Sequence, residues 1–568
     1  MVLLRSPPPS ALPPPVFPPE NMALCDRCSR LQRDNRAFKS TTDEVLFVQS
    51  QVKRIDHEIQ RLSAQRVLLH RRLNSIAATT VVLPYEILSH VFKLVCPPLD
   101  VTATTELSTS SPTDSVAKHG GLTYPSMPLT LAAVSSQWRN IALTTPQLWS
   151  SAAFTLYQSR NIPNARALQA LATRSAPCPL SLSLIFATTD EARDRLGNDI
   201  PPSLDVLRVF LSHSTRWGSL KIDGLPPEWI PVLRQARNAT PRLHHLWLCP
   251  YDNSREQQLL DIFTHAPHLR RVTLDNTFLS AILLPWSGLT HLKVSWVSID
   301  ECAEMLRRCP SLVECDFSRI LSNAEFHPLP RSLSLDAASD TDPSAAPIIL
   351  ESLHTLAWSY AGDAWEFQLL DRILFPHLRV FKLKLRYDLT QFTFILSVLR
   401  RMLAHSSTHV HTLDWDLGCP WVDVVDILRD LKDLRVLRWV DEQDSQIVNT
   451  MINALVSPPS PLTGPHSVFL PRLTQLELRG HCHQVDVAWV KWIVDTLKKR
   501  WDLETKTGPS PSRLNQVTLA LTCSNMFLVE GETLVKEELR VLEMLGMCVR
   551  IVHHHSDFRA REGWLDEV

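Results

Sequence analysis

Four segments decide the fold, namely LTHLKV at 289–294, LVECDF at 312–317, LHTLAW at 353–358 and LRVFKL at 378–383. Each segment carries apolar residues at its first, fourth and sixth positions. The fourth and sixth positions flank a single residue, and this spacing of two suits a short β-strand with one face turned inward. The segments therefore predict a series of similar strands, each with one buried face.

The same pattern occurs ten times between residues 243 and 519. The copies start at Leu243, Leu269, Leu289, Leu312, Leu353, Leu378, Val410, Leu434, Leu473 and Leu514, at intervals of 20 to 41 residues. Leucine-rich repeats run about 20–29 residues, so the longer intervals imply insertions or a degenerate copy. Helical segments are expected between the strands, for example 256–265 and 299–309. Since one strand–helix unit cannot bury its own leucines, the units should stack into a solenoid over 151–552.

Two interpretations of this array stay open, an irregular solenoid arc and an ordinary α/β domain with leucine-rich strands. In a solenoid, the outward-facing residues of the strands would line the concave surface and bind a protein target. A mixture of charges and aromatic rings is typical of such interfaces, although each residue could equally belong to a solvated strand face. The candidates are Trp247, Lys293, Asp414, Asp416 and Arg435, with His244, His245 and Arg438 beside them.

An earlier segment, residues 43–78, predicts one long helix. Its apolar residues recur at alternating intervals of three and four: Val45, Val48, Val52, Ile55, Ile59, Leu62, Leu69, Leu73 and Ile76. Arg66 is the one polar residue in this register. The spacing fits the seam of a coiled coil, which would make the chain a homodimer through 43–78. The alternative is a long helix that packs back on its own chain.

Three shorter helices are expected over 79–150. The first begins at Leu83-Pro84 and ends before Pro97-Pro98, because proline suits a first turn and stops a helix elsewhere. A flexible insertion rich in Thr, Ser and Pro follows at 97–128. A second amphipathic helix over 129–142 would place Leu131, Val134, Trp138 and Ile141 on one face. Thr145-Pro146 then predicts an N-cap and the start of a short third helix near Trp149.

These segments resemble the F-box, and the neighbouring sequence is similar to a group of basidiomycete F-box proteins. The resemblance rests on Leu83-Pro84-x-Glu86-Ile87-Leu88 joined to Ser135-x-x-Trp138-Arg139, and it extends to about residue 320. It implies a three-helix module that binds a Skp1-like adaptor of a cullin-based ubiquitin ligase. The contact residues it implies are Leu83, Pro84, Ile87, Leu88, Val91, Leu131, Val134 and Trp138. Alternatively, these side chains form only the core of a small domain.

The fold class expected is therefore mainly an α/β solenoid. A long N-terminal helix and a three-helix F-box would precede an irregular leucine-rich repeat arc, irregular because the asparagine ladder of regular repeats is missing. A proline-rich disordered tail is expected at 1–42 and a C-terminal tail at 553–568.

Composition limits the classes of function. The 58 basic residues balance 59 acidic ones, which predicts no nucleic-acid interface. Only 14 glycines occur, and no phosphate-binding or catalytic motif is found, so we expect a non-catalytic subunit without cofactor or metal. Cys25-x-x-Cys28 lacks a second ligand pair, and the 12 cysteines are scattered and expected to be reduced. No segment reads as a signal peptide or membrane span, so a cytoplasmic or nuclear protein is expected.

The function that follows from the resemblance is substrate recognition within a Skp1-cullin-F-box type ubiquitin ligase. The F-box would bind the adaptor, and the repeat array would bind a protein substrate that the sequence does not identify. The alternative is a scaffold that uses the coiled coil and the solenoid without any ligase.

Overall fold

The fold is described from a computed structural model. It describes residues 40–77, 83–96, 99, 126–156, 162–186, 204–250, 258–320, 347–360, 366–385, 392–406, 410–416, 421–441, 447–456, 469–485, 487–506, 513–526 and 539–553. The chain divides into two compact units, Met1–Val82 and Leu83–Val568. No helix among the described residues is long and apolar enough to cross a membrane.

The first unit contains one long helix, α2 (Thr41–Ala77), which runs for 37 residues. The prediction of a helix over 43–78 is therefore confirmed within one or two residues at each end. Asp43 and Glu44 lie in its first turn, where carboxylates interact favourably with the free backbone N–H groups. Of the proline-rich tail predicted at 1–42, residues 1–39 lie outside the described residues.

The second unit begins with a small helical module. It consists of α3 (Tyr85–Val95), α4 (Ser126–Val134), α5 (Ser136–Leu143) and the 3₁₀ helix η2 (Pro146–Trp149). The insertion predicted at 97–128 is shorter than expected, because α4 already begins at Ser126. Apart from residue 99, positions 97–125 lie outside the described residues.

The prediction of one continuous helix over 129–142 is wrong, because the chain breaks at Ser135 into α4 and α5. Ser135 has extended backbone angles, and its hydroxyl oxygen accepts a hydrogen bond of 3.1 Å from the Trp138 N–H. A serine in this N-cap conformation starts a new helix instead of continuing the preceding one.

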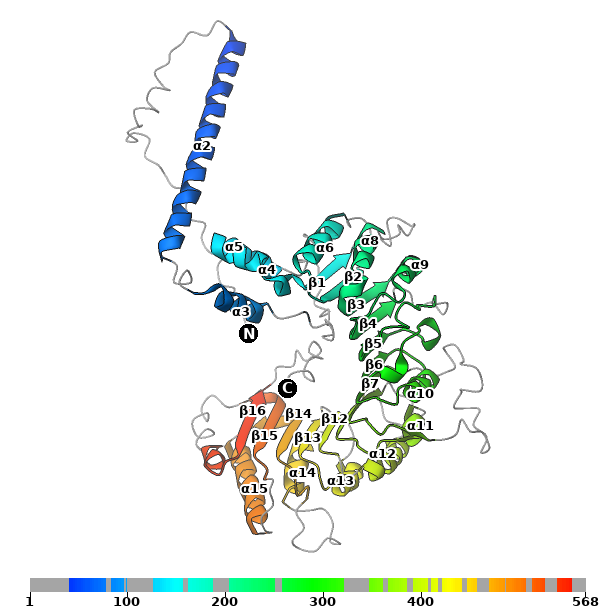
Figure 1. The fold of residues 1–568 in the computed structure, drawn as a ribbon. Helices are drawn as coiled ribbons and strands as arrows, with labels where there is room; N and C mark the ends of the chain where they lie inside the picture. Colours follow the sequence, from blue (N-terminus) through cyan, green and yellow to red (C-terminus); the bar gives the residue numbers. More distant parts are fainter. Residues whose placement is uncertain are drawn as a thin grey trace. The chain divides into compact units, whose positions relative to one another are not determined.

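A parallel sheet of 14 strands forms the rest of the unit (Figure 1). Its strands follow one another in sequence order: β1 (Ser151–Leu156), β2 (Leu180–Phe186), β3 (Trp217–Leu225), β4 (His245–Pro250), β5 (Arg271–Asp275), β6 (His291–Ser295), β7 (Glu314–Ser318), β9 (Thr355–Tyr360), β11 (Val380–Leu385), β12 (Thr412–Asp416), β13 (Val436–Asp441), β14 (Gln475–Val485), β15 (Gln516–Met526) and β16 (Cys548–His553). A separate parallel pair joins β8 (Ile348–Ile349) to β10 (Ile373–Leu374).

All ten copies of the leucine pattern are strands, and each strand begins two residues after the first apolar residue of its copy. Equivalent residues of successive copies are neighbours in the sheet: Leu292 pairs with Cys315, Cys315 with Leu356, and Leu356 with Phe381. This constant register confirms the repeat interpretation and gives a solenoid-like α/β arrangement. Strands β1, β2, β3 and β16 lie outside the ten copies.

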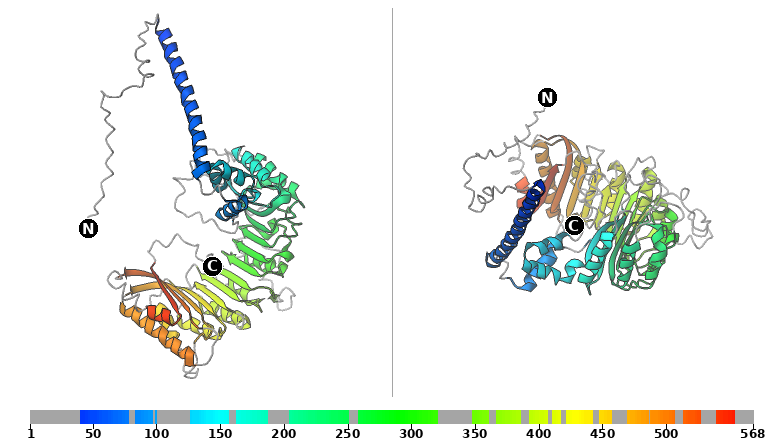
Figure 2. Two further views of the ribbon diagram at one scale, coloured as in Figure 1. Left: turned by 60° about the vertical axis from the view of Figure 1, so that its left-hand side comes forward. Right: turned by 90° about the horizontal axis from the view of Figure 1, so that it is seen from above.

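Helices connect many of the strands and cover one face of the sheet (Figures 1 and 2). They are α6 (Ile162–Arg174), α8 (Leu204–Ser212), α9 (Ile230–Leu233), α10 (Ile299–Arg308), α11 (Glu366–Asp371), α12 (Phe392–Ser406), α13 (Trp421–Asp430), α14 (Ile447–Ala454) and α15 (Val487–Lys506). Five short 3₁₀ turns complete the described connections: η3 (Ser214–Arg216), η4 (Pro227–Trp229), η5 (Arg234–Ala236), η6 (Leu279–Ala281) and η7 (Trp286–Gly288).

The two helices predicted between the repeats differ in outcome. The helix over 299–309 is α10, which starts at a capping box formed by Ser298 and Glu301. The prediction of a helix over 256–265 is wrong for the described part, 258–265. This part forms turns and one parallel bridge between Leu260 and Ile282. Pairing with a distant segment replaces the helical hydrogen bonds there.

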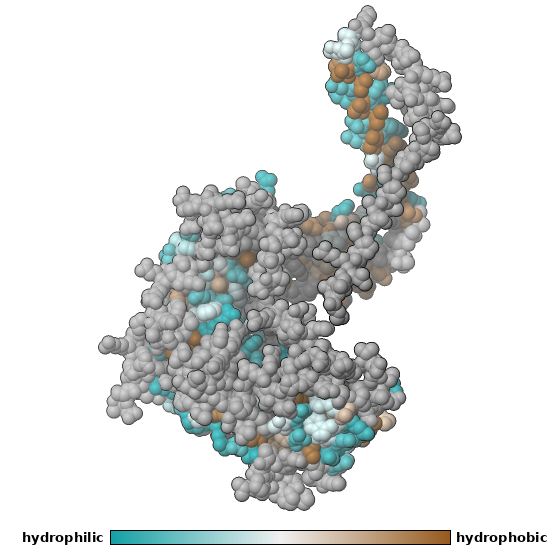
Figure 3. Space-filling model, turned by 180° about the vertical axis from the view of Figure 1, so that it is seen from behind, coloured by the Kyte–Doolittle hydropathy of each residue, from teal (hydrophilic) through white to brown (hydrophobic). Residues whose placement is uncertain are grey.

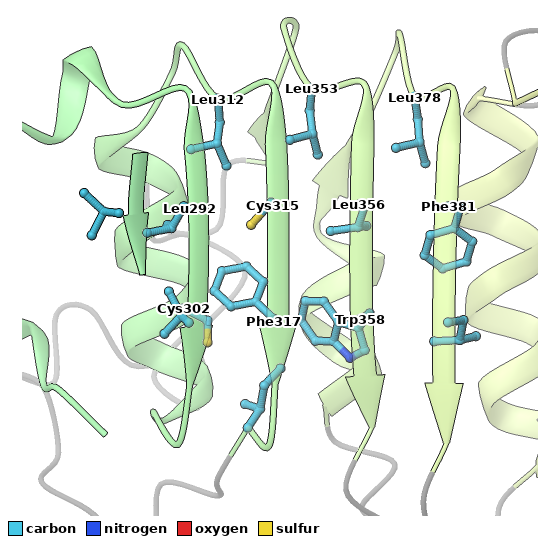
Figure 4. Packing of buried hydrophobic residues seen from close by; sticks show 14 of the residues in the cluster. Leu292, Cys302, Leu312, Cys315, Phe317, Leu353, Leu356, Trp358, Leu378 and Phe381 are labelled. Carbon is cyan, nitrogen blue, oxygen red and sulfur yellow. The ribbon is translucent and has the colours of Figure 1, made fainter. Parts of the chain in front are cut away.

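The main core lies between the sheet and its helices. Figure 4 shows its layers: Leu312, Leu353 and Leu378 form one row, and Cys315, Leu356 and Phe381 form the next. A third row contains Phe317 and Trp358, whose rings meet edge to face at 5.5 Å between centroids. Each such buried side chain contributes about 1.5–3 kcal/mol, so the stacked rows hold successive repeats together.

Candidate functional site

The helical module has a small core of its own, separate from the core of the sheet. Its buried members come from all four helices: Leu88, Phe92, Leu131, Ala132, Ile141, Ala142, Leu148 and Trp149. The Trp138 ring packs against this core, with its centroid 4.9 Å from that of Phe92. The helices on either side of the insertion therefore pack against one another, as a single module requires.

Hydrogen bonds fasten α3 to the end of α5. The hydroxyls of Ser89 and Thr145 lie 3.1 Å apart in a buried position, and the Tyr85 hydroxyl donates to the Thr144 carbonyl at 3.1 Å. The Trp149 indole N–H donates to the Ala142 carbonyl at 2.7 Å. Thr145 occupies the N-cap position of η2 as predicted, but its hydroxyl donates to the Ile141 carbonyl instead of capping η2.

The opposite side of α3 carries apolar side chains that the module does not bury. Ile87, Val91 and Leu94 of α3, together with Leu83 just before the helix, are hereafter the α3 stripe; they recur at intervals of three and four and are 40–69% exposed. Residues so spaced lie on one face of a helix. An 11-residue helix thus presents two apolar faces, one toward the core and one toward solvent.

The eight residues that the resemblance implicates fall into two groups. Leu88 and Leu131 are buried in the module core, and Trp138 is half-buried against it. The exposed group consists of Leu83, Pro84, Ile87, Val91 and Val134. Core formation therefore accounts for Leu88, Leu131 and Trp138, and the other five side chains remain exposed.

Val134 does not share a face with Leu131 and Ile141, contrary to the expectation from one continuous helix. Val134 is 52% exposed, whereas Leu131 and Ile141 are buried. The physical reason is the break at Ser135, which interrupts the helical periodicity between α4 and α5.

A second candidate surface lies on the face of the sheet that points away from the main core. Because side chains alternate along a strand, residues between two core positions project onto this face. One row across the sheet carries Lys221, Trp247, Thr273, Lys293, Asp316, Ala357, Lys382, Asp414, Arg438, Glu477, Thr518 and Arg550. This row is called the polar row below.

Opposite charges meet along the polar row. Lys293 Nζ lies 3.2 Å from a carboxylate oxygen of Asp316. Arg438 lies between two acids, with Nε 3.3 Å from Glu477 and a terminal nitrogen 4.0 Å from Asp414. Burial raises the pKa of Asp414, and the nearby Arg438 and Lys382 partly oppose that rise. The row therefore presents both signs of charge on neighbouring strands.

The five predicted target-binding residues occupy different environments. Trp247 and Asp414 belong to the polar row but are only 6% exposed. Lys293 is accessible and paired with Asp316, and Asp416 follows two positions beyond Asp414 on the same strand. Arg435 is exposed but lies directly before β13, outside the strand, whereas Arg438 lies in the row itself.

Two further charged residues at this face were not identified from the sequence. Lys221 and Asp223 lie on β3, which lacks the leucine pattern. Burial lowers the pKa of Lys221 and raises that of Asp223. Their position follows only from the pairing of β3 with β4. His245, also a candidate, is buried at the start of β4.

Across the described parts of the chain, no group of three or more His, Cys, Asp or Glu side chains is placed to hold a metal ion. The Cys25-x-x-Cys28 pair lies outside the described residues.

Comparison with known proteins leaves the family open. No family model matches the chain, and no curated protein matches it. Among solved structures, a Bacteroides fragilis protein determined by the Northeast Structural Genomics Consortium aligns over 67% of this chain and 75% of its own, at 10% identity. The TM-score of that alignment is 0.26, too low to establish a common fold.

Proposed function

We propose that the chain is an F-box substrate receptor of a Skp1-cullin-F-box type ubiquitin ligase. The α3 stripe would bind a Skp1-like adaptor, and the polar row would bind a protein target. Such a receptor catalyses nothing itself, because it acts by raising the effective concentration of its target near the ubiquitin-transferring partner.

The observation that carries the proposal is the double amphipathicity of α3. Leu88 and Phe92 already complete the module core, so Ile87 and Val91 are not needed for folding. Exposed apolar residues at helical spacing are typical of a helix that docks into a groove of another protein. Two residues of the α3 stripe, Leu83 and Ile87, belong to the Leu-Pro-x-Glu-Ile-Leu motif on which the F-box resemblance rests.

Within the sheet, we assign target binding to the polar row because it carries charged side chains that are accessible. The side chains of Lys293, Asp316, Arg438 and Glu477 are each 27–41% exposed. A target with charges in the opposite order could exchange these internal ion pairs for intermolecular ones. Such complementarity provides specificity more than affinity.

The test is binding of a purified Skp1-like adaptor to the full chain and to the double variant Ile87→Glu/Val91→Glu. Each apolar side chain contributes about 1.5 kcal/mol or more when buried at an interface, so the pair should weaken binding at least about 100-fold. Because both residues are exposed, the variant should keep the helical content and thermal midpoint of the native protein.

Leu204→Glu is the matched control, since Leu204 is an exposed leucine of α8, outside the module. Its binding should equal that of the native chain. If the adaptor binds the double variant and the native chain equally well, or fails to bind the native chain at all, the ligase proposal is rejected.

The second candidate function is a scaffold without a ligase. One observation favours it: α2 also exposes apolar residues, and these could bind a partner without an adaptor. The two functions differ in the fate of a captured target. A target of the ligase accumulates when the proteasome is inhibited, whereas a target of the scaffold does not.

A further inference from the structure

The helix α2 exposes a continuous apolar seam. Its members are called the α2 stripe: Val45, Val48, Val52, Ile55, Ile59, Leu62, Leu69 and Leu73, each 46–71% exposed. Figure 3 shows apolar residues alternating with polar ones along this helix. At 1.5 Å per residue the helix is about 55 Å long. A helix in water gains most of its stability by burying such a face. We therefore expect the α2 stripe to pack against an apolar surface of a partner.

The spacing of the stripe indicates that the partner is another helix. Intervals of three and four alternate without interruption, with Arg66 filling the one polar position. This average of 3.5 residues keeps the seam facing a second helix through successive turns.

The charges of α2 are unevenly distributed along its length. Residues 41–58 contain four acids (Asp43, Glu44, Asp56, Glu58) and two bases (Lys53, Arg54), a net charge of 2 − 4 = −2. Residues 59–77 contain four bases (Arg61, Arg66, Arg71, Arg72) and no acid, a net charge of +4. The helix is therefore negative in its first half and positive in its second.

This polarity makes the helix complementary to itself in one orientation only. Side by side in the same direction, two copies would bring their +4 halves together and place Arg66 against Arg66 in the apolar seam. In opposite directions, each positive half meets a negative half. Like charges across an interface are unfavourable and opposite charges favourable.

We propose that α2 pairs with α2 of a second copy of this chain as an antiparallel coiled coil. The register that pairs seam positions with seam positions aligns residues whose numbers sum to 121, so Val52 lies beside Leu69 of the second copy and Ile59 beside Leu62. Arg66 then lies beside Ile55 of the second copy, next to Asp56, with which it can form an ion pair. This pairing does not depend on the proposed adaptor binding.

The first test is the mass of the full chain in solution by sedimentation velocity. A dimer of about 129 kDa, twice 64.4 kDa, is expected at micromolar concentration. Ile59→Glu/Leu62→Glu places charges in the central layers and should weaken self-association at least about 100-fold, since apolar burial is lost in both copies.

The matched control is Leu46→Glu/Leu68→Glu, which changes two leucines of the same helix that are 60% and 62% exposed but lie outside the stripe. This variant should stay dimeric. A monomeric native chain, or a dimer that survives Ile59→Glu/Leu62→Glu, overturns the proposal.

The second test measures orientation by the distance between spin labels on the two copies, introduced as an unnatural amino acid at Ser50 or at Gln60, both exposed. In the antiparallel pair, Ser50 lies beside residue 71, so its two labels are offset by 21 residues, about 32 Å along the axis. The labels at Gln60 lie almost level. Equally short distances at both positions indicate a parallel pair and overturn the antiparallel assignment.

Discussion

The ammonium nitrogen of Lys221 lies 4.3 Å from the centroid of the Trp247 ring, across the pairing of β3 with β4. Both residues are buried, on the face of the sheet away from the main core. A cation over an indole face is attracted by the electron density of the ring. Trp247, expected from the sequence to contact a target, is therefore part of the internal structure of this face.

The first prediction concerns Trp247. Trp247→Ala should lower the free energy of unfolding by about 3–5 kcal/mol, as removal of a large buried ring generally does. Trp296 is the comparison, since it also lies under a cation, the guanidinium of Arg319 at 5.0 Å, but is 39% exposed. Trp296→Ala should cost about 1 kcal/mol or less. Equal shifts of the two thermal unfolding midpoints would contradict the structural role of Trp247.

The second prediction concerns Arg500, whose side chain is completely buried. Its guanidinium donates to the carbonyls of Leu455, Phe469 and Leu470, which belong to the connection before β14. Arg500→Met should cost about 2–5 kcal/mol, because the substitution leaves buried carbonyls without donors.

The adjacent Lys499 provides the control for Arg500, because it is exposed. Lys499→Met should leave the chemical denaturation midpoint almost unchanged. Both residues belong to the basic run Lys498-Lys499-Arg500, but Lys499 is exposed whereas Arg500 is buried and bound to three carbonyls. A destabilised Lys499→Met, or an unaffected Arg500→Met, would show that this arrangement does not stabilise the sheet.

The third prediction is a pH dependence. Burial raises the pKa of the Cys309 thiol to about 12 and that of Cys315 well above its ordinary value. Both should resist alkylation at pH 9–10 in the folded protein, whereas the exposed Cys548 should react. Mass spectrometry of labelled peptides measures this site by site, with the denatured chain as the reference in which all three react.

The same raised pKa values make stability fall at alkaline pH. The unfolded chain releases these protons near pH 9.0, the ordinary thiol value, whereas the folded chain retains them. Stability contributed by the protonated thiols is therefore complete below that value and decreases as the pH rises toward 12. Cys309→Ala should make the decrease shallower in unfolding measured from pH 8 to pH 10.5.

The fourth prediction tests the break between α4 and α5. Ser135→Ala removes the hydroxyl that accepts from the Trp138 N–H and should cost about 1 kcal/mol. Ser136→Ala, one residue later at an exposed position, should be neutral. A change of similar size in both thermal midpoints would argue against the N-cap role.

The repeats were predictable because their signal is local and recurs. Each copy carries its own strand period, so ten strands could be placed from residue spacing alone. The capping box at Ser298 and Glu301 is likewise visible in the sequence three residues apart. The prediction of a helix at 256–265 was wrong because Leu260 pairs with Ile282, and no local pattern encodes this contact.

The module was predictable in its helices but not in its faces. The pattern of α3 shows Ile87 and Leu88 as neighbouring apolar residues, and local sequence does not say which one meets the core. The packing of α3 against the other helices decides that question, since Leu88 belongs to the same core as Ile141 while Ile87 stays exposed.

By itself, the sequence determined the long helix α2, its apolar seam, the ten repeat strands and the motif that resembles an F-box, because all of these depend on spacing within a few residues. Only the tertiary structure decided which side chains remain accessible. Burial depends on neighbours far apart in the chain, as Lys221 over Trp247 and the carbonyls around Arg500 show, and those neighbours are brought together only when the strands stack.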